Sequence, residues 1–409
     1  MKRSCKHIDI TDWKTVLPWV QECIFRHRDR YDFQHLLRDF GCIVEEDWDG
    51  TIHAIAKYAA TSIKNRELIL RPVHIREKRD VSSLKLRLIG EESAMQQVFD
   101  YIAVRACEEI WQRRIVPQQS SSIPGRGQVY GTAMISRWIR KDRRAANYAK
   151  NHRLKYSRKC RYFVKLDVKK CYQSMRVGCF MKLFARDCAN EDLLWLWRSL
   201  LFRHRVLITD TEKIYEGFMI GALPSQQAAQ YILSFLYRFA MGLHKTRRSI
   251  QTKVVTHMEL FMDDMLLFSS DKRNLKSAVR KVIMFANRQF NITIKPNWQI
   301  CDIDKTPVDM MGYVVHADGN VTIRPRVFLR TRRLALRIMR RGSISYRQAM
   351  RLSSYKGFFF QRQKRICFPL KSQKISKKLH LQSLFKSASR LIGNRERRKH
   401  ACCIQLQAG

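Results

Sequence analysis

The sequence predicts an α+β fold in which antiparallel hairpins alternate with amphipathic helices. The clearest hairpin signal is Asp263-Asp264, a pair of turn residues between the apolar runs Leu260–Met262 and Met265–Phe268. With 409 residues, of which 45% are hydrophobic, the chain is large enough to bury a substantial core shared by two or three subdomains. Apolar residues at helical spacing mark the segments 93–111, 227–241 and 276–290.

Charge is the most unusual property of the composition. The chain contains 79 Lys and Arg against 35 Asp and Glu, so its formal net charge is +44. Self-repulsion on this scale opposes a compact fold unless a polyanion is bound. Nucleic acid is the expected polyanion, because neutralising each phosphate releases counterions. An anionic membrane is the rival, but we find no amphipathic anchor and no apolar span long enough to cross a bilayer.

The cysteines and the N-terminus bear on the compartment. The 12 cysteines are scattered without a CxxC pair, which predicts reduced structural thiols and neither a disulfide framework nor a zinc ribbon. The first residues are basic but are followed by Ile8–Asp12, so they lack the apolar core of a signal peptide. We therefore expect a cytoplasmic protein.

In chain order, residues 1–65 are a charged, helical N-terminal region to which we assign no chemistry. Leu68–Arg76 is expected to be a strand at a sheet edge or with a bulge, because a proline interrupts it. Leu84–Ile89 alternates apolar and basic residues, and the two segments together predict a hairpin. Its basic face would present Lys85 and Arg87 to a phosphate chain, although a solvated strand face explains the pattern equally well.

Two segments between residues 120 and 161 have compositions that suit nucleic acid. In the loop Ser120–Gly127, glycines permit close backbone approach, and Arg126 supplies charge for a phosphate backbone or an incoming nucleotide. Residues 140–161 contain ten Lys and Arg and a single acid, interleaved with tyrosines. This combination is typical of surfaces for single-stranded nucleic acid, because bases stack on rings while cations follow phosphates. A helix that is only solvated usually balances its charges.

Three further segments place polar side chains at strand ends. Tyr162–Leu166 reads as a strand that runs directly into Asp167. Phe218–Gln226 is a strand-end loop that opens a helix, with a proline near the first turn. Ile292–Asn297 reads as a strand that delivers Lys295 to a turn.

The C-terminal part of the chain is strongly cationic. Met311–Val315 and Val321–Ile323 predict a hairpin around a turn rich in Asp, Gly and Asn. Beyond Asp318 the only acid is Glu396, and helical periodicity continues through much of this part. We expect a basic helical region from residue 321 to the end of the chain.

Three carboxylates then stand out together. Asp263-Asp264 taken alone is best interpreted as a turn exposed to water. With Asp167 it forms a set of three strand-end carboxylates in a chain of charge +44. Two divalent cations about 3.5–4 Å apart, bridged by such carboxylates, would activate a 3′-hydroxyl and stabilise a pyrophosphate leaving group. Oxygen-only ligands favour Mg²⁺, with Mn²⁺ as a substitute, and no His/Cys cluster favours zinc.

In order and spacing, these motifs closely resemble those of the reverse transcriptases over residues 71–357. Phe261–Asp264 is similar to their Y/F-x-D-D catalytic turn, and Phe163–Tyr172 is similar to the strand that carries their first aspartate. Ile294-Lys295 resembles the palm lysine proposed to protonate pyrophosphate, and Met311–Tyr313 resembles the primer-grip hairpin.

The resemblance implies the right-hand polymerase fold, with fingers, a palm built on an antiparallel sheet, and a helical thumb. The implied domains are an N-terminal helical region 1–65, fingers 66–160, a palm 161–320 with a fingers insertion around 180–215, and a basic helical thumb and tail 321–409.

The resemblance also implies roles for single residues. Tyr172 falls at the steric gate of the family, an aromatic residue that excludes a 2′-hydroxyl and so selects dNTPs. The implied catalytic residues are Asp167, Asp263, Asp264 and Lys295, and the implied metal ligands are Asp167, Val168, Asp263 and Asp264. The implied nucleotide contacts are Lys85, Arg87, Val168, Tyr172, Ile220, Gly221 and Gln226. The implied template and primer contacts are Arg126, Met311, Gly312 and Tyr313.

One departure from the family pattern narrows the resemblance. Most relatives carry Gln-Gly-x-x-x-Ser-Pro at the helix-opening loop, whereas this chain has Ile-Gly-Ala-Leu-Pro-Ser-Gln at Ile220–Gln226. This loop and Ser121–Gly127 resemble those of reverse transcriptases from diversity-generating retroelements. In that group the polymerase copies a template-repeat RNA, misincorporates opposite adenine, and works with a small basic accessory variability protein. An aliphatic residue cannot hydrogen-bond near the templating base or the dNTP, which weakens geometric discrimination.

We therefore expect an RNA-directed DNA polymerase that makes error-prone, adenine-mutagenised cDNA by two-metal nucleotidyl transfer. Its partners would be template RNA, a cDNA or primer strand, dNTPs and the accessory protein, in the cytoplasm of a prokaryotic or phage-infected cell. One alternative is another prokaryotic reverse transcriptase, from a retron, a phage-defence system or an intron. The other is a catalytically idle RNA-binding protein of the same fold, against which the intact carboxylates argue.

Overall fold

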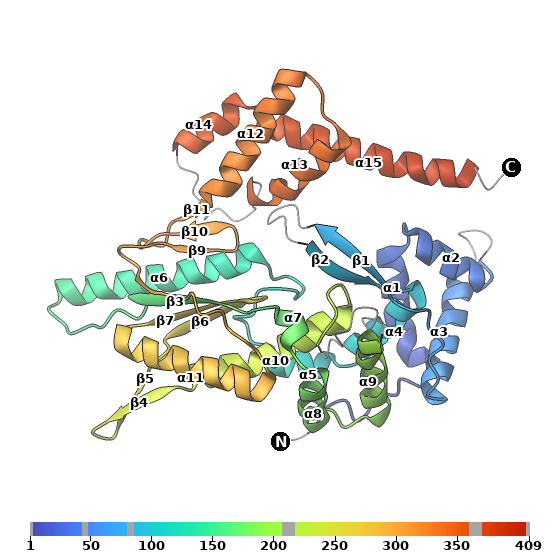
Figure 1. The fold of residues 1–409 in the computed structure, drawn as a ribbon, viewed down its shortest axis with the longest axis horizontal. Coiled ribbons are helices and arrows are strands. Elements are labelled where there is room, and N and C mark those ends of the chain that lie inside the picture. The colour runs from blue at the N-terminus through green and yellow to red at the C-terminus, as the bar shows by residue number, and fades with distance from the viewer. Residues whose placement is uncertain (1–2, 43–47, 80–85, 207–216, 360–369, 406–409) are drawn as a thin grey trace. The chain divides into compact units, whose positions relative to one another are not determined.

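The computed structural model describes residues 3–42, 48–79, 86–206, 217–359 and 370–405 (Figure 1). The described residues contain fifteen helices and eleven strands. The mixed helix and sheet content that the sequence predicts is thereby confirmed. None of the helices within these ranges is long and apolar enough to cross a membrane.

The chain forms two compact units, which are described separately. The first unit comprises Met1–Pro124, Lys165–Leu266 and Arg273–Gln299. The second unit comprises Gly125–Val164, Leu267–Lys272 and Ile300–Gly409.

The first unit is mainly helical. Side-chain caps begin two of its helices: Asp12 accepts hydrogen bonds from the amides of residues 14 and 15, and Ser93 accepts one from the amide of Gln96. Its helices are α1 (Trp13–His27), α2 (Tyr31–Asp39), α3 (Trp48–Lys64), α4 (Ala94–Arg105), α5 (Glu108–Arg114), α7 (Cys171–Ser174), α8 (Val177–Asp187), α9 (Glu191–Val206), α10 (Leu223–Met241) and α11 (Lys272–Phe290). α1 packs on α3 and α4, and α4 packs on α10.

An aromatic cluster forms the centre of this helical core. Trp111 of α5 and Tyr231 of α10 lie against three further rings of α8 and α9, with neighbouring centroids 5.1–6.2 Å apart. Beside the cluster, the buried carboxylate of Asp187 accepts two hydrogen bonds from Arg114 at 2.5 Å and one from the Tyr231 hydroxyl at 2.7 Å. This ion pair is satisfied on both oxygens, as a buried charge requires.

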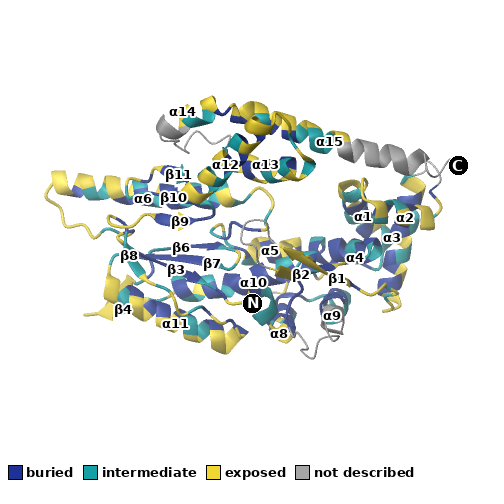
Figure 2. Cartoon of the chain, turned by 45° about the horizontal axis from the view of Figure 1, so that its top comes forward, coloured by how far each residue is buried: buried dark blue, intermediate teal, exposed yellow. Residues whose placement is uncertain are grey.

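The first unit also contains two hairpins. β1 (His74–Arg79) and β2 (Leu86–Glu91) pair antiparallel, which confirms the predicted hairpin, although the first strand begins at His74 and not at Leu68. β4 (His244–Arg247) and β5 (Ile250–Lys253) form a ribbon whose eight strand residues are all exposed. Figure 2 shows this ribbon as a yellow extension after α10.

The central sheet has the strand order β6-β7-β3-β8, with β6 (His257–Phe261), β7 (Asp264–Ser269), β3 (Tyr162–Asp167) and β8 (Ile300–Asp302). β7 is buried along its length after its first residue, and β6, β7 and β3 are mostly dark blue in Figure 2. Strands covered on both faces read as continuous apolar runs, which explains the sequence Met-Leu-Leu-Phe in β7.

The second unit combines a small sheet with basic helices. Its helices are α6 (Gln128–Asn151), α12 (Pro325–Arg341), α13 (Tyr346–Phe359), α14 (Leu370–Lys378) and α15 (Leu381–Gln405), and its sheet has the order β11-β10-β9. β10 (Tyr313–Val315) and β11 (Val321–Ile323) form the hairpin predicted from the sequence. β9 (Val308–Met310) pairs with the other edge of β10. The Ser136 hydroxyl of α6 donates a hydrogen bond to the Gly319 carbonyl at 2.6 Å.

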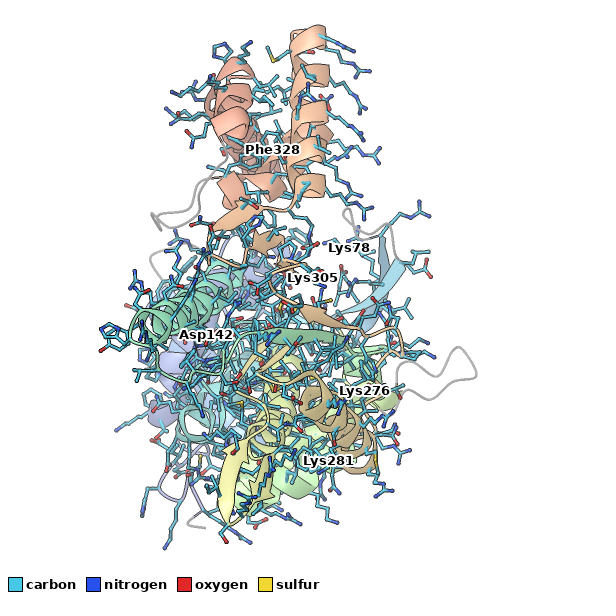
Figure 3. All side chains as sticks on the ribbon, turned by 90° about the vertical axis from the view of Figure 1, so that its left-hand side faces the viewer. Lys78, Asp142, Lys276, Lys281, Lys305 and Phe328 are labelled. Atoms are coloured by element: carbon cyan, nitrogen blue, oxygen red, sulfur yellow. The ribbon has the colours of Figure 1, made fainter. Side chains whose placement is uncertain are left out.

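The single acid of the basic segment 140–161 is a structural residue. Asp142 is 4% exposed and accepts hydrogen bonds from the Tyr156 hydroxyl at 2.8 Å and from the amides of Lys159 and Cys160 at 2.7 and 3.1 Å. Figure 3 labels Asp142 on α6, together with Lys276 and Lys281, which project from α11 into solvent. Asp142 is therefore buried, whereas Lys276 and Lys281 of α11 are exposed.

Candidate active site

The predicted Asp-Asp turn is displaced by one residue. β6 ends at Phe261, β7 begins at Asp264, and the two linking residues are Met262 and Asp263. Met262 has φ +53°, a left-handed conformation that costs a residue with a side chain roughly 1–2 kcal/mol. The two aspartates therefore have different settings, since Asp263 belongs to the turn and Asp264 to the first position of a buried strand.

Backbone hydrogen bonds bring Asp167 and Lys295 to this turn. Val168, directly after β3, donates its amide hydrogen to the Asp263 carbonyl at 3.1 Å. The amide of Lys295 donates to the Asp167 carbonyl at 2.9 Å. Residues 292–297 do not form the predicted strand, because their only ladder contact is an isolated bridge between Ile294 and Val168. The structure thus gathers Asp167, Asp263, Asp264 and Lys295, of which the first and last are 128 positions apart in sequence, at one end of the sheet.

Two lysines neutralise two of the three carboxylates. Lys295 Nζ lies 2.5 Å from Asp167 Oδ2, and Lys165 Nζ lies 3.2 Å from Asp264 Oδ2. Burial raises the pKa of the Asp264 carboxyl above its usual value, and the negative charges of Asp263 and Asp167 raise it further, while Lys165 opposes the shift. The three carboxylates are therefore close enough to repel one another, and the site favours cations.

The donor chemistry suits Mg²⁺ or Mn²⁺, which prefer carboxylate oxygens. No three acidic, histidine or cysteine side chains within the described ranges are arranged to hold one ion. Instead, ammonium groups occupy positions beside Asp167 and Asp264 where a metal ion would also be attracted. The residues fit divalent ions by ligand type and charge, and Asp167, Asp263 and Asp264 are the side chains that could hold them.

Tyr172 lies in the short helix α7 next to the carboxylates. Its carbonyl accepts a hydrogen bond from the Phe218 amide at 2.7 Å, which ties α7 to the loop before α10. Burial raises the pKa of the Tyr172 phenol well above its usual value, and the nearby Cys171 and Asp263 reinforce that shift. The phenol is consequently neutral at physiological pH and presents an uncharged ring.

The loop Ile220–Gln226 is fastened to the β1–β2 hairpin. The Gly90 amide of β2 donates to the Ile220 carbonyl at 2.9 Å. Gly221 has φ +118°, and a Cβ atom at this position would lie 2.7 Å from the Gly90 carbonyl oxygen. Arg87 is exposed on β2, whereas Lys85 lies outside the described residues. The structure therefore brings Ile220 and Gly221 against β2, the strand that also carries Arg87.

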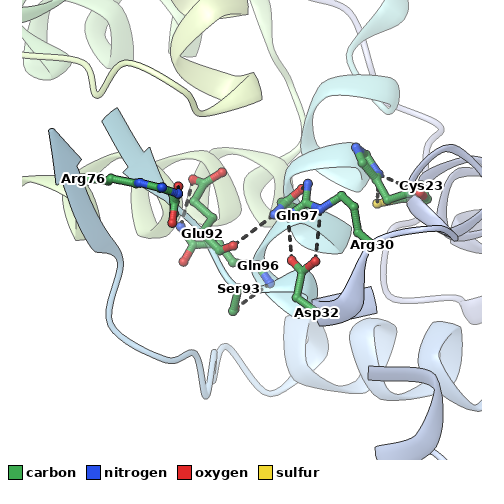
Figure 4. A network of polar contacts seen from close by, with 10 residues as sticks. Cys23, Arg30, Asp32, Arg76, Glu92, Ser93, Gln96 and Gln97 are labelled. Atoms are coloured by element: carbon green, nitrogen blue, oxygen red, sulfur yellow. Dashed lines mark hydrogen bonds and ion pairs between the residues drawn. The ribbon is translucent and has the colours of Figure 1, made fainter. Parts of the chain in front are cut away.

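A cavity of about 1510 Å³ in the first unit is lined by Gly221 and Gln226 but not by Asp167, Asp263 or Asp264. In its wall Arg30 is bonded to Asp32, and Glu92 to Gln96 (Figure 4). Asp100, which is 1% exposed, also lines it, and burial together with Glu92 raises the pKa of the Asp100 carboxyl well above its usual value. Glu92 and Asp100 line one part of the wall, and Arg71 and Arg76 also line the cavity.

The predicted template and primer residues lie in the second unit. The Arg126 guanidinium lies 6.0 Å from the Tyr130 ring centroid. Met311 and Gly312 are not the start of a strand, as predicted, but the two-residue turn between β9 and β10, with φ +56° and +81°. Tyr313 is 0% exposed, with its ring 5.5 Å from that of Phe358.

Three residues at the site were missed from the sequence. Lys165 pairs with Asp264, and its signal was a lysine within the otherwise apolar strand Tyr162–Leu166. Ser121 accepts a hydrogen bond from the Met262 amide and a second one from Gln230 Nε2. No local sequence pattern predicts these two contacts.

Three carboxylates at strand ends, with lysines beside them in a strongly cationic chain, are the arrangement expected of nucleotidyl-transfer enzymes. Comparison with known proteins identifies the family. Residues 78–315, more than half of the 409-residue chain, match the model of the family described as reverse transcriptase (RNA-dependent DNA polymerase). The chain therefore belongs to the reverse transcriptase family. Comparison with curated protein sequences gives no match.

Solved structures similar to the chain include two telomerases. Apo telomerase from Candida tropicalis, truncated from its C-terminal domain, is 13% identical over 62% of this chain and 54% of its own, with a TM-score of 0.42. Telomerase from Candida albicans, in complex with a TWJ fragment of telomeric RNA, is 12% identical over 80% of this chain and 58% of its own, with a TM-score of 0.41. The chain thus spans little more than half the length of either telomerase.

Proposed function

We propose that this chain is an RNA-directed DNA polymerase that extends a primer with dNTPs on an RNA template. The proposal rests on the gathering of Asp167, Asp263 and Asp264 with Lys295 at one end of the sheet, in a chain that belongs to the reverse transcriptase family. Bound Mg²⁺ or Mn²⁺ would supply activation of the 3′-hydroxyl and charge stabilisation of the pyrophosphate. In this scheme residues 66–160 are the fingers, 161–320 the palm and 321–409 the thumb and tail.

Each residue near the carboxylates then has a defined task. Lys295, now paired with Asp167, would donate a proton to the leaving pyrophosphate. The neutral Tyr172 ring would pack beneath the sugar and exclude a 2′-hydroxyl. Arg87, with Lys85, would contact the triphosphate from β2, while Val168 would contribute its backbone beside Asp167. Arg126 and the Met311–Gly312 turn would contact template and primer, while the buried Tyr313 would support that turn.

The decisive test of polymerase activity is the variant Asp263→Asn, which removes one negative charge with little change of shape. Primer extension on an RNA template with Mg²⁺ should fall below detection, while RNA affinity stays within about twofold because the cationic surface is untouched. The matched control Asp29→Asn alters an aspartate whose side chain is 82% exposed and should behave as wild type. Extension by Asp263→Asn at the wild-type rate contradicts the assignment; RNA binding without extension by the wild-type chain identifies the idle RNA-binding alternative.

We further propose that the polymerase is of the diversity-generating type. It would copy a template-repeat RNA with errors opposite adenine, in a prokaryotic or phage-infected cell, together with a small basic accessory protein. Support comes from Ile220, whose carbonyl is tied to the Gly90 amide and whose aliphatic side chain offers no hydrogen bond to a base or dNTP. A retron, phage-defence or intron-encoded enzyme would not be expected to concentrate its errors at adenine.

The variant Ile220→Gln tests this subgroup assignment. It restores an amide at the position where most relatives carry glutamine, and should lower the error frequency opposite template adenine by about tenfold, a gain of discrimination worth about 1.4 kcal/mol. Sequencing of cDNA made on one defined RNA gives the error spectrum, and Ile220→Leu is the size-matched control. Equal adenine error frequencies in the wild type and Ile220→Gln would remove the proposed basis of mutagenesis.

A further inference from the structure

A buried serine holds the turn that carries the catalytic aspartates. The amide of Met262 donates a hydrogen bond to Ser121 Oγ at 2.8 Å. Met262 is the residue with the left-handed φ, and its side chain is itself 41% exposed, so packing of that side chain contributes little to holding the turn. The strained conformation is therefore stabilised through its backbone amide, and the partner of that amide is Ser121.

A chain of amides fixes the orientation of Ser121. Its Oγ accepts a second hydrogen bond from Gln230 Nε2 of α10 at 2.8 Å. Gln230 Oε1 in turn accepts from Gln119 Nε2 at 2.8 Å, and Gln119 Oε1 accepts from the Val116 amide at 3.0 Å. Ser121, Gln230 and Gln119 are 2%, 1% and 0% exposed. Because Gln119 Oε1 accepts from the Val116 amide, its Nε2 donates to Gln230 Oε1, and Gln230 therefore presents its NH₂ group to Ser121.

The segment before Ser121 is also joined to the strand that leads into the turn. The Ser120 amide donates to the Leu260 carbonyl at 3.0 Å, and the Leu260 amide donates to the Gln118 carbonyl at 2.9 Å. The Ser120 hydroxyl donates to Glu259 Oε1 at 2.5 Å, and Glu259 is 0% exposed. These contacts run alongside β6 and set Ser121 at its end, directly against Met262.

We infer that Ser121 is a positioning residue of this polymerase site, an inference that rests on the proposed function. The turn is held at both of its residues: Met262 by Ser121 through its amide, and Asp263 by Val168 through its carbonyl. Since Asp263 and Asp264 follow Met262 directly, its backbone angles set the direction of both carboxylates. Ser121 therefore acts on divalent-ion binding through the backbone, with no contact of its own to substrate.

The test compares Mg²⁺ dependence in Ser121→Ala and the wild type. Removing the hydroxyl leaves the Met262 amide and Gln230 Nε2 without their acceptor in a buried setting. Loss of a residue that orients metal ligands typically costs 10–100-fold in metal affinity or activity. We expect the half-saturating Mg²⁺ concentration for single-nucleotide extension to rise by about tenfold or more, with unchanged RNA affinity. Direct titration with Mn²⁺, followed by electron paramagnetic resonance, should show the same weakening without turnover.

Two controls separate positioning from general loss of structure. Ser234→Ala removes another fully buried serine hydroxyl, which bonds only to the Tyr231 carbonyl of its own helix at 2.7 Å. Its Mg²⁺ and Mn²⁺ dependence should equal that of the wild type. Ser121→Thr retains the oxygen acceptor and should recover most of the loss. Should Ser121→Ala fail to fold, Gln230→Met removes the amide that orients Ser121 and should give a smaller shift in the same direction.

Wild-type Mn²⁺ affinity and Mg²⁺ dependence in Ser121→Ala, or an equal shift in Ser234→Ala, would overturn the inference. Failure of the proposed function is distinguishable, because the wild-type chain would then extend no primer at any Mg²⁺ concentration. In that event the Mn²⁺ titrations of the wild type and Ser121→Ala still decide whether Ser121 positions the carboxylates.

Discussion

Two glycines that face each other across the β2–loop contact provide a sharp test of the architecture. Gly221 has φ +118°, and its substitution by alanine would place a methyl group 2.7 Å from the Gly90 carbonyl oxygen and 3.0 Å from Ile89 Cγ2. In Gly90→Ala the atoms nearest the new methyl group would all belong to the side chain of Met219, with the sulfur at 1.9 Å. A methionine side chain is flexible and can move aside, whereas a backbone carbonyl in a strand cannot.

The two variants should therefore differ in stability. For Gly221→Ala, a positive φ costs roughly 1–2 kcal/mol, and overpacking against backbone costs about 1–3 kcal/mol. Strain that breaks the bond from the Gly90 amide to the Ile220 carbonyl adds about 1 kcal/mol, for a total of about 3–6 kcal/mol. For Gly90→Ala, rearrangement of Met219 should cost about 1 kcal/mol, the lower end of the overpacking range.

Urea denaturation monitored by circular dichroism measures the stability difference, and hydrogen exchange of the peptide containing Gly90 reports the bond to Ile220 directly. We expect faster exchange at Gly90 in Gly221→Ala and a smaller midpoint change in Gly90→Ala. If Gly221→Ala is no less stable than Gly90→Ala, the positive φ and the backbone contact do not constrain this loop, and the reasoning is refuted.

Two further predictions concern the ion pair and the ribbon of the first unit. Asp187→Asn should destabilise the protein by about 3–5 kcal/mol at pH 7, because it leaves the Arg114 guanidinium half-buried without its counter-charge. Burial raises the pKa of the Asp187 carboxyl, but the hydrogen bonds from Arg114 and Tyr231 outweigh this and hold the pKa below its usual value. The stabilisation that the Asp187 carboxylate gives the fold is therefore present above the unfolded pKa of about 3.9 and is lost as the pH falls through the folded pKa. The wild type and Asp187→Asn should therefore converge in unfolding midpoint below about pH 4, and a constant difference would contradict this account. In the exposed β4–β5 ribbon, replacing Lys245, Arg247, Arg248 and Lys253 by Gln should reduce the slope of log affinity for RNA against log salt by up to about 3, since each phosphate contact contributes about 0.7–0.9. Exchanging Lys and Arg at these four positions preserves charge and should preserve the slope, and a slope unchanged by neutralisation would show that the ribbon does not contact RNA.

Elements with a local signature were predictable from the sequence. The apolar runs on either side of Asp263-Asp264 became β6 and β7, and the β-branched and aromatic run before Asp167 became β3. The conformation of the turn between these strands could not be predicted, because its left-handed residue is Met262 and no rule of local propensity assigns that conformation to methionine. The same reason applies to Met311 in the turn between β9 and β10.

Contacts between distant segments could not be predicted. Lys295 reaches Asp167 through one isolated bridge and not through a regular strand, so the alternation of its neighbours was a misleading signal. Lys165 contacts Asp264, and Ser121 contacts the Met262 turn, each from about a hundred or more residues away in sequence, so both contacts depend on which strands become neighbours. The order of strands in a sheet depends on how the whole chain packs, so it cannot be predicted from the hydrophobic periodicity of a single sequence.

The buried Asp142 has a consequence for how the basic segment 140–161 would meet RNA. Its carboxylate accepts bonds from Tyr156 and from the amides of Lys159 and Cys160, so the end of this segment is ordered by an internal anion. A cationic loop without such an anchor would become ordered only on meeting its polyanion and would lose conformational entropy at that moment. Here contacts within the protein itself order the end of the segment, so an RNA that binds there would meet cations on a preorganised backbone.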